Sequence, residues 1–339
     1  MSHHSSERIP WVDASKGICI LLVVMFHANL HITPILGSGG VFDTVARYSA
    51  PFRMPDFFLI CGLFLSRRIT APLSVYLDRK VVHFAYFYWL WILITCATIA
   101  PGLGYGFGPF LNSLATSLIY PQGWLWFIYC LPICFLIARV AEPLPRALTW
   151  LIAAGAHVFN VPGEPLIAVY LSHYFVFFYT GFVAAPALFE LARRAADRKL
   201  LACAGLATWA FVNGWIVFEQ PGSFPGLSLL LGLAGGCAIT VIASLLSTMP
   251  VGAALSWLGS RSIVVYLGFF IPLRFAEQAL LSVGLTSADL VILIAIVVAI
   301  AVPLALHKLV LRTGAGKWLF ERPSWARMPA QGGTQRASA

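Results

Sequence analysis

Charged residues are scarce in this chain. Only 10% of its 339 residues are Asp, Glu, Lys or Arg, while 60% are hydrophobic. Soluble globular proteins carry about 25% charged residues, so this composition excludes a water-soluble globular protein. No polar stretch is long enough to form a second domain, and apolar runs recur from residue 17 to residue 311. The sequence therefore predicts an all-α, polytopic integral membrane protein with one transmembrane domain, 1–320, and a disordered cytoplasmic tail, 321–339.

Other absences narrow the function. The seven cysteines all lie within apolar runs, with no C-x-x-C pair and no histidine at zinc-binding spacing, so we expect no structural metal site. The net charge is +9, but no basic face of a soluble module is present to bind nucleic acid. The first apolar run lacks a small-x-small cleavage site, so we expect it to stay as a helix rather than serve as a signal peptide.

Long apolar runs are what the chain does have. A membrane-spanning helix needs about 20 mostly apolar residues. Ten runs of that order occur, at 17–36, 48–66, 81–100, 122–141, 146–160, 166–190, 200–218, 227–248, 257–281 and 288–311. If the N-terminus is cytoplasmic, nineteen of the 22 Lys and Arg residues fall on the cytoplasmic side, and only Arg47, Arg53 and Arg274 do not. This asymmetry predicts cytoplasmic N- and C-termini.

Ionisable side chains inside a bilayer are costly and mark candidate functional sites. Lys16 stands at the cytoplasmic end of the first run, and His27 lies about 16 Å deeper along a helix. Asp56 lies about 15 Å from the cytoplasmic end of the second run. Because the two depths match, we predict that Asp56 holds one ring nitrogen of His27 and leaves the other free as a base.

Each of these residues also has a purely structural interpretation. His27 could be satisfied by a backbone or hydroxyl partner across a helix contact, and Asp56 could pair with Arg53 three residues earlier. His31 follows His27 by four residues on the same helix face, so a metal pair is formally possible. No third ligand is evident, and we expect no metal.

Basic residues gather in the inner loop 66–83, beside Lys16. They are Arg67, Arg68, Arg79, Lys80 and His83. Topology alone would explain them, but they would also suit the phosphates of an acyl-CoA, because arginine forks match phosphate oxygens. On the outer side, the candidate contacts for a carbohydrate or another polar acceptor are Arg53, Trp124, Trp126, His173 and Arg274.

Several segments resemble a known family. The segment WVDASKGICILLVVMFH contains a basic residue, Lys16, ten intervening residues and a histidine, His27. This pattern resembles the first helix of the membrane-bound acyltransferase 3 family. The run PFRMPDFFLICGLFL resembles the family's second-helix segment, and Trp257–Leu267 resembles the segment that opens its penultimate helices. In this chain His83 stands where many members have an arginine, and Phe269 where many have a histidine.

The resemblance implies an O-acyltransferase of the bacterial inner membrane with about ten transmembrane helices. Such an enzyme transfers an acyl group, often acetyl from cytosolic acetyl-CoA, to a hydroxyl group of a sugar or surface polysaccharide, with no permanently bound cofactor. By the resemblance His27 would be the catalytic residue, while Lys16, Arg79 and Lys80 would serve the donor side. Asp56 is unusual for the family pattern, and its orienting role rests on the depth argument above. An acyl-histidine intermediate is equally compatible with the sequence.

Two other classes of function stay open at this stage. In a proton-coupled secondary transporter or flippase, His27 and Asp56 would relay protons. The chain has no evident internal repeat, which disfavours the inverted-repeat transporters. A non-catalytic sensor or scaffold could also retain the acyltransferase frame, with Phe269 as the trace of a lost activity.

Overall fold

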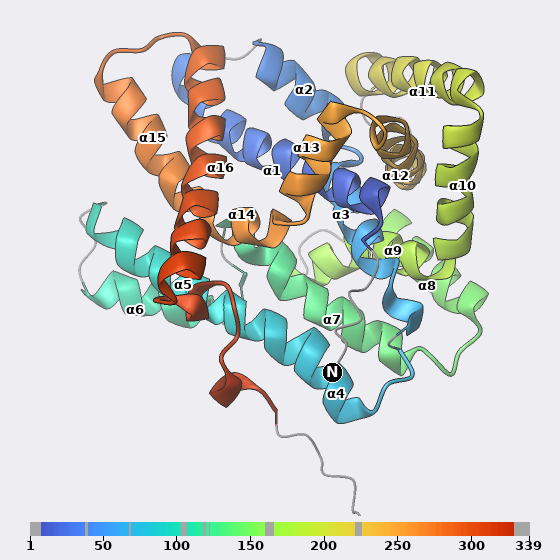
Figure 1. Cartoon of the computed structure of the whole chain (residues 1–339), viewed down its shortest axis with the longest axis horizontal. Coiled ribbons are helices and arrows are strands. Elements are labelled where there is room, and N and C mark those ends of the chain that lie inside the picture. Colours follow the sequence, from blue (N-terminus) through green and yellow to red (C-terminus); the bar gives the residue numbers. More distant parts are fainter. Residues whose placement is uncertain are drawn as a thin grey trace, which may run out of the picture. The chain divides into compact units, whose positions relative to one another are not determined.

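The computed structural model describes residues 8–37, 40–67, 69–102, 107–117, 120–121, 123–159, 166–220 and 226–328. Within these ranges every regular element is a helix and no strand occurs, which confirms the predicted all-α fold (Figure 1). The described residues divide into two compact units, one from 8–64 and 144–309 and the other from 65–143 and 310–328. Each unit therefore combines segments that are distant in the sequence.

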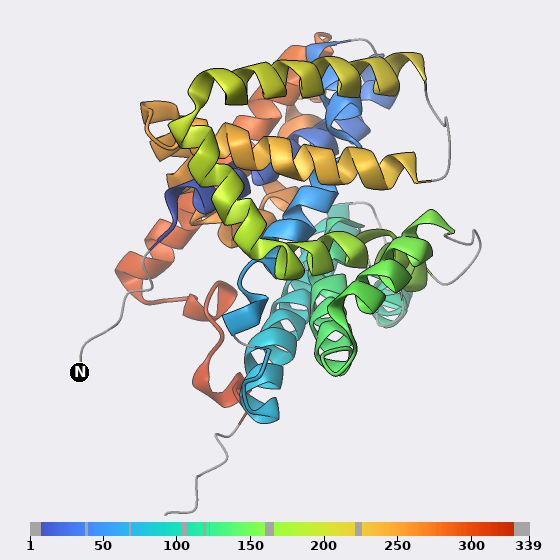
Figure 2. The ribbon, with the colours of Figure 1, turned by 90° about the vertical axis from the view of Figure 1, so that its right-hand side faces the viewer.

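The first unit contains most of the helices. They are α1 (Pro10–Leu36), α2 (Val41–Ser49), α3 (Arg53–Gly62), α8 (Arg146–Val158), α9 (Leu166–Val183), α10 (Ala185–Asp197), α11 (Lys199–Glu219), α12 (Leu227–Leu246), α13 (Pro250–Gly259), α14 (Ser262–Gly268), α15 (Phe270–Ser282) and most of α16 (Ala288–Thr313). Helix α1 packs against α2, α3, α12, α13, α14 and α15, and so forms the centre of this unit. Figure 2 shows α11 and α12 side by side, with α10 leading into α11.

The second unit is smaller. It contains η1 (Leu65–Arg67), α4 (Leu73–Leu77), the π-helical turn η2 (Asp78–Val82), α5 (His83–Gly102), α6 (Phe107–Thr116), η3 (Gly123–Leu125), α7 (Trp126–Val140), η4 (Lys317–Leu319) and η5 (Ser324–Ala326). Helices α4, η2 and α5 follow one another without a gap and pack against α7. A hydrogen bond of 2.7 Å from the Tyr76 hydroxyl to the Phe135 carbonyl oxygen joins α4 to α7.

Helix length confirms a polytopic membrane protein. Seven helices of the described chain are long and apolar enough to cross a bilayer, and the bent pair Pro250–Gly259 and Ser262–Gly268, with a bend of 58°, would make an eighth. The seven correspond to seven of the ten predicted runs. Neither the run 48–66 nor the run 146–160 forms one long helix; the second of these is the 13-residue helix α8.

Prolines explain two of the differences between the predicted runs and the helices. Pro51 lies in the break between α2 and α3, and Pro55 lies in the first turn of α3, where a missing N–H leaves no helical hydrogen bond unmade. The run 166–190 ends early, at Val183, because Pro186 cannot continue the helix and instead occupies the first turn of α10.

Glycines set the closest helix contacts of the first unit. A Cβ at Gly62 would meet the carbonyl oxygen of Phe178, and a Cβ at Gly181 would meet that of Leu59, so α3 and α9 touch backbone to backbone. Helix α1 meets α13 in the same way, through Gly17 and Gly259. Small residues at such contacts are the usual basis of helix association in lipid, where burial of apolar surface gives little driving force.

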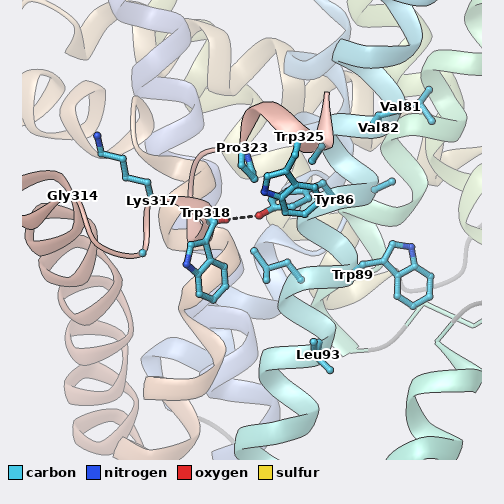
Figure 3. A pocket seen from close by; sticks show the side chains of 14 residues that line it. Val81, Val82, Tyr86, Trp89, Leu93, Gly314, Lys317, Trp318, Pro323 and Trp325 are labelled. Carbon is cyan, nitrogen blue, oxygen red and sulfur yellow. Dashed lines mark hydrogen bonds between the residues drawn. The ribbon is translucent and has the colours of Figure 1, made fainter. Parts of the chain in front are cut away.

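The described part of the C-terminal segment packs within the second unit. Arg322 donates to the Asp78 side chain at 2.6 Å, and the Met328 amide donates to the same carboxylate at 2.7 Å. The Tyr86 hydroxyl donates to the Trp318 carbonyl oxygen at 2.9 Å (Figure 3). The predicted tail, 321–339, thus begins with ordered contacts at 321–328, and residues 329–339 lie outside the described residues.

Between this segment and α5 lies a cavity of about 880 Å³. Its walls are mainly apolar and aromatic and include Trp89, Trp318 and Trp325 (Figure 3). Among the described lining residues only Lys317 is charged. Among the predicted donor-binding side chains, Arg79, Lys80 and His83 do not belong to its lining.

Candidate active site

His27 lies on α1 beside the junction of α14 and α15. Its ring centroid is 5.4 Å from those of Phe26 and Phe269 and 6.3 Å from that of Phe270. The side chain is only half-buried, and in the described part of the chain neither ring nitrogen has a hydrogen-bond partner. The rings of Phe26, Phe269 and Phe270 thus pack around the His27 imidazole, while both of its nitrogens stay available to a substrate.

Arg53, the first residue of α3, contacts α1 at Phe26, the residue before His27. Its guanidinium carbon lies 3.8 Å from the ring centroid of Phe26, and one of its nitrogens donates to the Ala46 carbonyl oxygen at 3.2 Å. The side chain is only 7% exposed. A desolvated cation on an aromatic face is stabilised by about 2 kcal/mol, so the fold keeps a positive charge next to His27.

Asp56 lies elsewhere, and the predicted hydrogen bond to His27 is wrong. The Asp56 carboxylate accepts a hydrogen bond from the Cys19 thiol at 2.7 Å, and its other oxygen has no described partner. Cys19 precedes His27 by eight residues, or about 12 Å of helix. The depth argument assumed one continuous helix over 48–66, whereas α3 has only 10 residues and ends at Gly62. The structural alternative for Asp56, an ion pair with Arg53, is also not formed in the described chain.

A second polar group lies one turn beyond His27. His31 Nδ1 is 3.3 Å from a carboxylate oxygen of Glu277, and Arg274 donates to the same oxygen at 2.6 Å. The Glu277 side chain is only 2% exposed. Arg274 is a predicted acceptor contact, and His31 was considered only as half of a metal pair. Glu277 was not among the predicted site residues. Its spacing of three residues from Arg274, inside an otherwise apolar run, is the signal that could have found it.

The predicted donor-binding residues are divided between the two units. Lys16, in the first unit, forms an ion pair of 3.0 Å with Asp13. In the second unit, Lys80 lies 4.2 Å from the ring centroid of Phe135, His83 packs against the rings of Phe84 and Phe87, and Arg79 is exposed. Arg67 ends η1, and Arg68 lies outside the described residues.

The predicted acceptor contacts are divided in the same way. Arg53 and Arg274 lie in the first unit, in the two groups just described. His173 of α9, also in that unit, has its ring 4.3 Å from the ring of His157. Trp124 and Trp126 belong to the second unit, the former buried and the latter edge-to-face with Phe127. The predicted acceptor contacts thus do not form one cluster. Arg53 contacts Phe26 of α1, Arg274 binds Glu277 of α15, and His173 packs against His157.

Comparison with known proteins points to one family. The family model described as an acyltransferase domain matches residues 9–308. The chain is 24% identical, over 298 residues, to the inner membrane protein YcfT of Escherichia coli strain K12, and the alignment covers 76% of this chain and 77% of YcfT. No solved structure matches the chain.

The matched residues run from the start of α1 into α16, so they include His27, the aromatic junction beside it and Arg53. The matched range contains all the segments that carried the resemblance in the sequence. A multi-pass helical fold with a half-buried, unbonded histidine between aromatic rings accords with that match, and the chain belongs to the acyltransferase 3 family of membrane acyltransferases.

Proposed function

We propose that this membrane acyltransferase is an O-acyltransferase that moves an acyl group, most simply acetyl, from a cytosolic acyl-CoA to a hydroxyl group on a sugar or surface glycan. The observation that carries the proposal is the environment of His27, a half-buried imidazole with no hydrogen-bond partner in the described chain, in a protein of an acyltransferase family. A neutral imidazole of this kind can act as a general base near neutral pH.

The proposed reaction uses His27 to move one proton. One ring nitrogen removes the proton of the acceptor hydroxyl as the oxygen attacks the thioester carbonyl carbon, and a C–O bond forms. When the C–S bond breaks, the imidazolium returns that proton to the CoA thiolate. Arg53, held over Phe26, supplies positive charge beside the base for the oxyanion of the tetrahedral intermediate. Asp56, bonded to Cys19, has no part in this scheme.

The donor and acceptor roles of the remaining residues are parts of the same proposal. The phosphates of CoA would be bound by the basic residues Lys16, Arg67, Arg68, Arg79, Lys80 and His83. The acceptor would contact His173, Arg274, Trp124 and Trp126. Because arginine binds phosphate in a fork geometry and lysine as a point charge, Arg79→Lys should raise the KM for acyl-CoA with little change in kcat.

The test is acyl transfer by purified protein in detergent. With radiolabelled acetyl-CoA and membranes from its own source, the protein should release CoA and label glycan. His27→Ala should lose about 100-fold or more of both signals, while His307→Ala, on α16, serves as the matched histidine control. If folded His27→Ala turns over like the parent protein, the proposed role of His27 is wrong. If the parent itself neither transfers nor hydrolyses, the transporter and scaffold alternatives gain.

A further inference from the structure

A serine and a second buried histidine meet away from His27. His157, at the end of α8, is only 3% exposed, and both of its ring nitrogens are bonded. Nδ1 lies 2.7 Å from the carbonyl oxygen of His173, and Nε2 lies 2.8 Å from the hydroxyl oxygen of Ser228. All three residues belong to the first unit.

The backbone contact decides where the protons lie. A carbonyl oxygen can only accept a hydrogen bond, so Nδ1 of His157 must carry the proton that it donates to His173. In the neutral imidazole Nε2 then carries a lone pair, and the Ser228 hydroxyl must be the donor to it. The hydroxyl proton of Ser228 therefore already points at a base whose other nitrogen is fixed by a third group.

The chain builds this contact through a glycine turn. Gly226, directly before α12, has φ +89°, a left-handed conformation that favours glycine. It lies near Val158, the neighbour of His157, because a Cβ at Gly226 would be 3.5 Å from a Val158 methyl group. The turn thus sets the first residues of α12, and Ser228 among them, against the end of α8.

Ser228 is accessible although its base is buried. Its side chain is exposed, and it is the second residue of the candidate membrane span Leu227–Leu246, at the end of the span rather than in its middle. The first amide groups of a helix have no carbonyl partner within the helix and carry partial positive charge. An oxyanion forming on a group attached to Ser228 would meet that charge.

We propose that Ser228 and His157 form a nucleophilic dyad that takes up an acyl group from an activated ester, such as an acyl thioester, as acyl-serine. The Ser228 oxygen attacks the acyl carbon while Nε2 of His157 takes the hydroxyl proton. The bond to the leaving group then breaks, and the imidazolium returns the proton to the departing thiolate or alkoxide. Nδ1 keeps its own proton and its bond to His173 throughout, as the orienting group does in a catalytic triad.

This inference does not rest on the role of His27. The dyad is made by α8, α9 and α12, whereas His27 lies between α1 and the junction of α14 and α15. The two centres can therefore be removed separately.

The experiment treats the purified full-length protein with a fluorophosphonate probe, which traps activated serines, and identifies the modified residue by peptide mass spectrometry. The adduct is expected on Ser228, absent in Ser228→Ala and formed about 100-fold more slowly in His157→Gln. Ser172→Ala is the matched control, because the Ser172 hydroxyl, on α9, donates to the Val169 carbonyl oxygen at 3.0 Å and forms no hydrogen bond to an imidazole in the described chain.

A second reagent keeps the test independent of the probe. p-Nitrophenyl acetate should acetylate Ser228 in the parent protein and in His27→Ala alike, and Ser228→Cys should still be acylated. Thermal unfolding shows which variants are folded. A folded parent protein with no adduct on Ser228, or an adduct that forms equally fast in folded His157→Gln, would overturn the proposal. Loss of CoA release in His27→Ala with the Ser228 adduct intact would separate the two centres.

Discussion

Three histidines of the first unit differ in what their ring nitrogens do. Both nitrogens of His157 are hydrogen-bonded, His31 is bonded to Glu277, and His27 lies among aromatic rings with no hydrogen-bond partner in the described chain. An imidazole needs a free lone pair to accept a proton from a substrate. By this criterion His27 is open to a diffusible substrate, and His157 is committed to Ser228.

The group of His31, Glu277 and Arg274 gives a prediction at the residue scale. Arg274→Gln leaves the buried Glu277 carboxylate with His31 as its remaining partner, whereas Glu277→Gln leaves an arginine whose side chain is 42% exposed and can be hydrated. We expect Arg274→Gln to lower the free energy of unfolding by about 1–3 kcal/mol, and Glu277→Gln by less. Denaturant unfolding in detergent measures both, and the opposite order would contradict the account.

The residue scale also shows what the sequence could and could not provide. The spacing correctly placed Lys16 and His27 on one helix, because α1 carries both, and their roles stay predictions. Asp56 was misplaced because its depth was counted along a helix that ends at Gly62. The pairing of His157 with Ser228 joins residues 71 positions apart, and no local pattern encodes a contact of that kind.

Where two helices touch backbone to backbone, as α3 and α9 do, the glycines at the contact leave no room for a larger side chain. At Gly181 a methyl group would meet the Leu59 carbonyl oxygen, whereas Gly205, on α11, has nothing within 4 Å of the same position. Gly181→Ala should therefore destabilise the protein by about 1–3 kcal/mol or more. Gly205→Ala should be neutral or stabilising by up to about 1 kcal/mol, because alanine favours the helix. Thermal midpoints in detergent compare them, and equal midpoints would refute the close contact of α3 and α9.

Helix α10 gives a prediction about pH, because its charged face lies outside the candidate spans. Hydrogen bonds from Arg193 and Arg194 lower the pKa of Glu190 from its ordinary 4.5 to about 2. A carboxyl group with a lowered pKa stabilises the folded state above its unfolded pKa, and that contribution is lost as the pH falls toward about 2. Glu190→Gln should thus lower the thermal midpoint slightly at neutral pH, and the difference should vanish in strong acid or high salt. A difference that grows in acid would have the wrong sign.

A proline within a predicted run does not by itself end the helix, since α7 continues through Pro132 and α16 through Pro303. Seven runs became helices long enough to span a membrane, since uninterrupted apolar sequence leaves the backbone no other way to satisfy its hydrogen bonds in lipid. Pro186 follows the end of the shortened helix in one of these seven runs, 166–190, and Pro51 lies in the break within another run, 48–66. Hydrophobicity alone did not register these breaks, because an average over 20 residues gives one proline little weight.

At the scale of the whole molecule, the second unit depends on its C-terminal segment. Asp78 binds both Arg322 and the Met328 amide. Asp78→Ala should free this segment, so trypsin should cut after Lys317 and Arg327 several-fold faster than in the parent protein, while the Arg322–Pro323 bond resists trypsin in both. Glu321→Ala, which removes an exposed acid from the same segment, is the control. Limited proteolysis followed by mass spectrometry measures the rates, and unchanged cutting in Asp78→Ala would show that these bonds do not hold the segment.

The order of synthesis gives this arrangement a consequence for assembly in the cell. Residues 65–143 leave the ribosome well before residues 310–328, and the helices from α8 to α16 enter the membrane in between. Throughout that interval Asp78 lacks its partner Arg322, and the Tyr86 hydroxyl lacks its acceptor, the Trp318 carbonyl oxygen. The second unit can close only after residues 310–328 have been synthesised. A premature stop codon soon after α16 would therefore yield a chain that contains all the candidate spans of the described residues. Its second unit would stay unpacked and would be exposed to quality-control proteases.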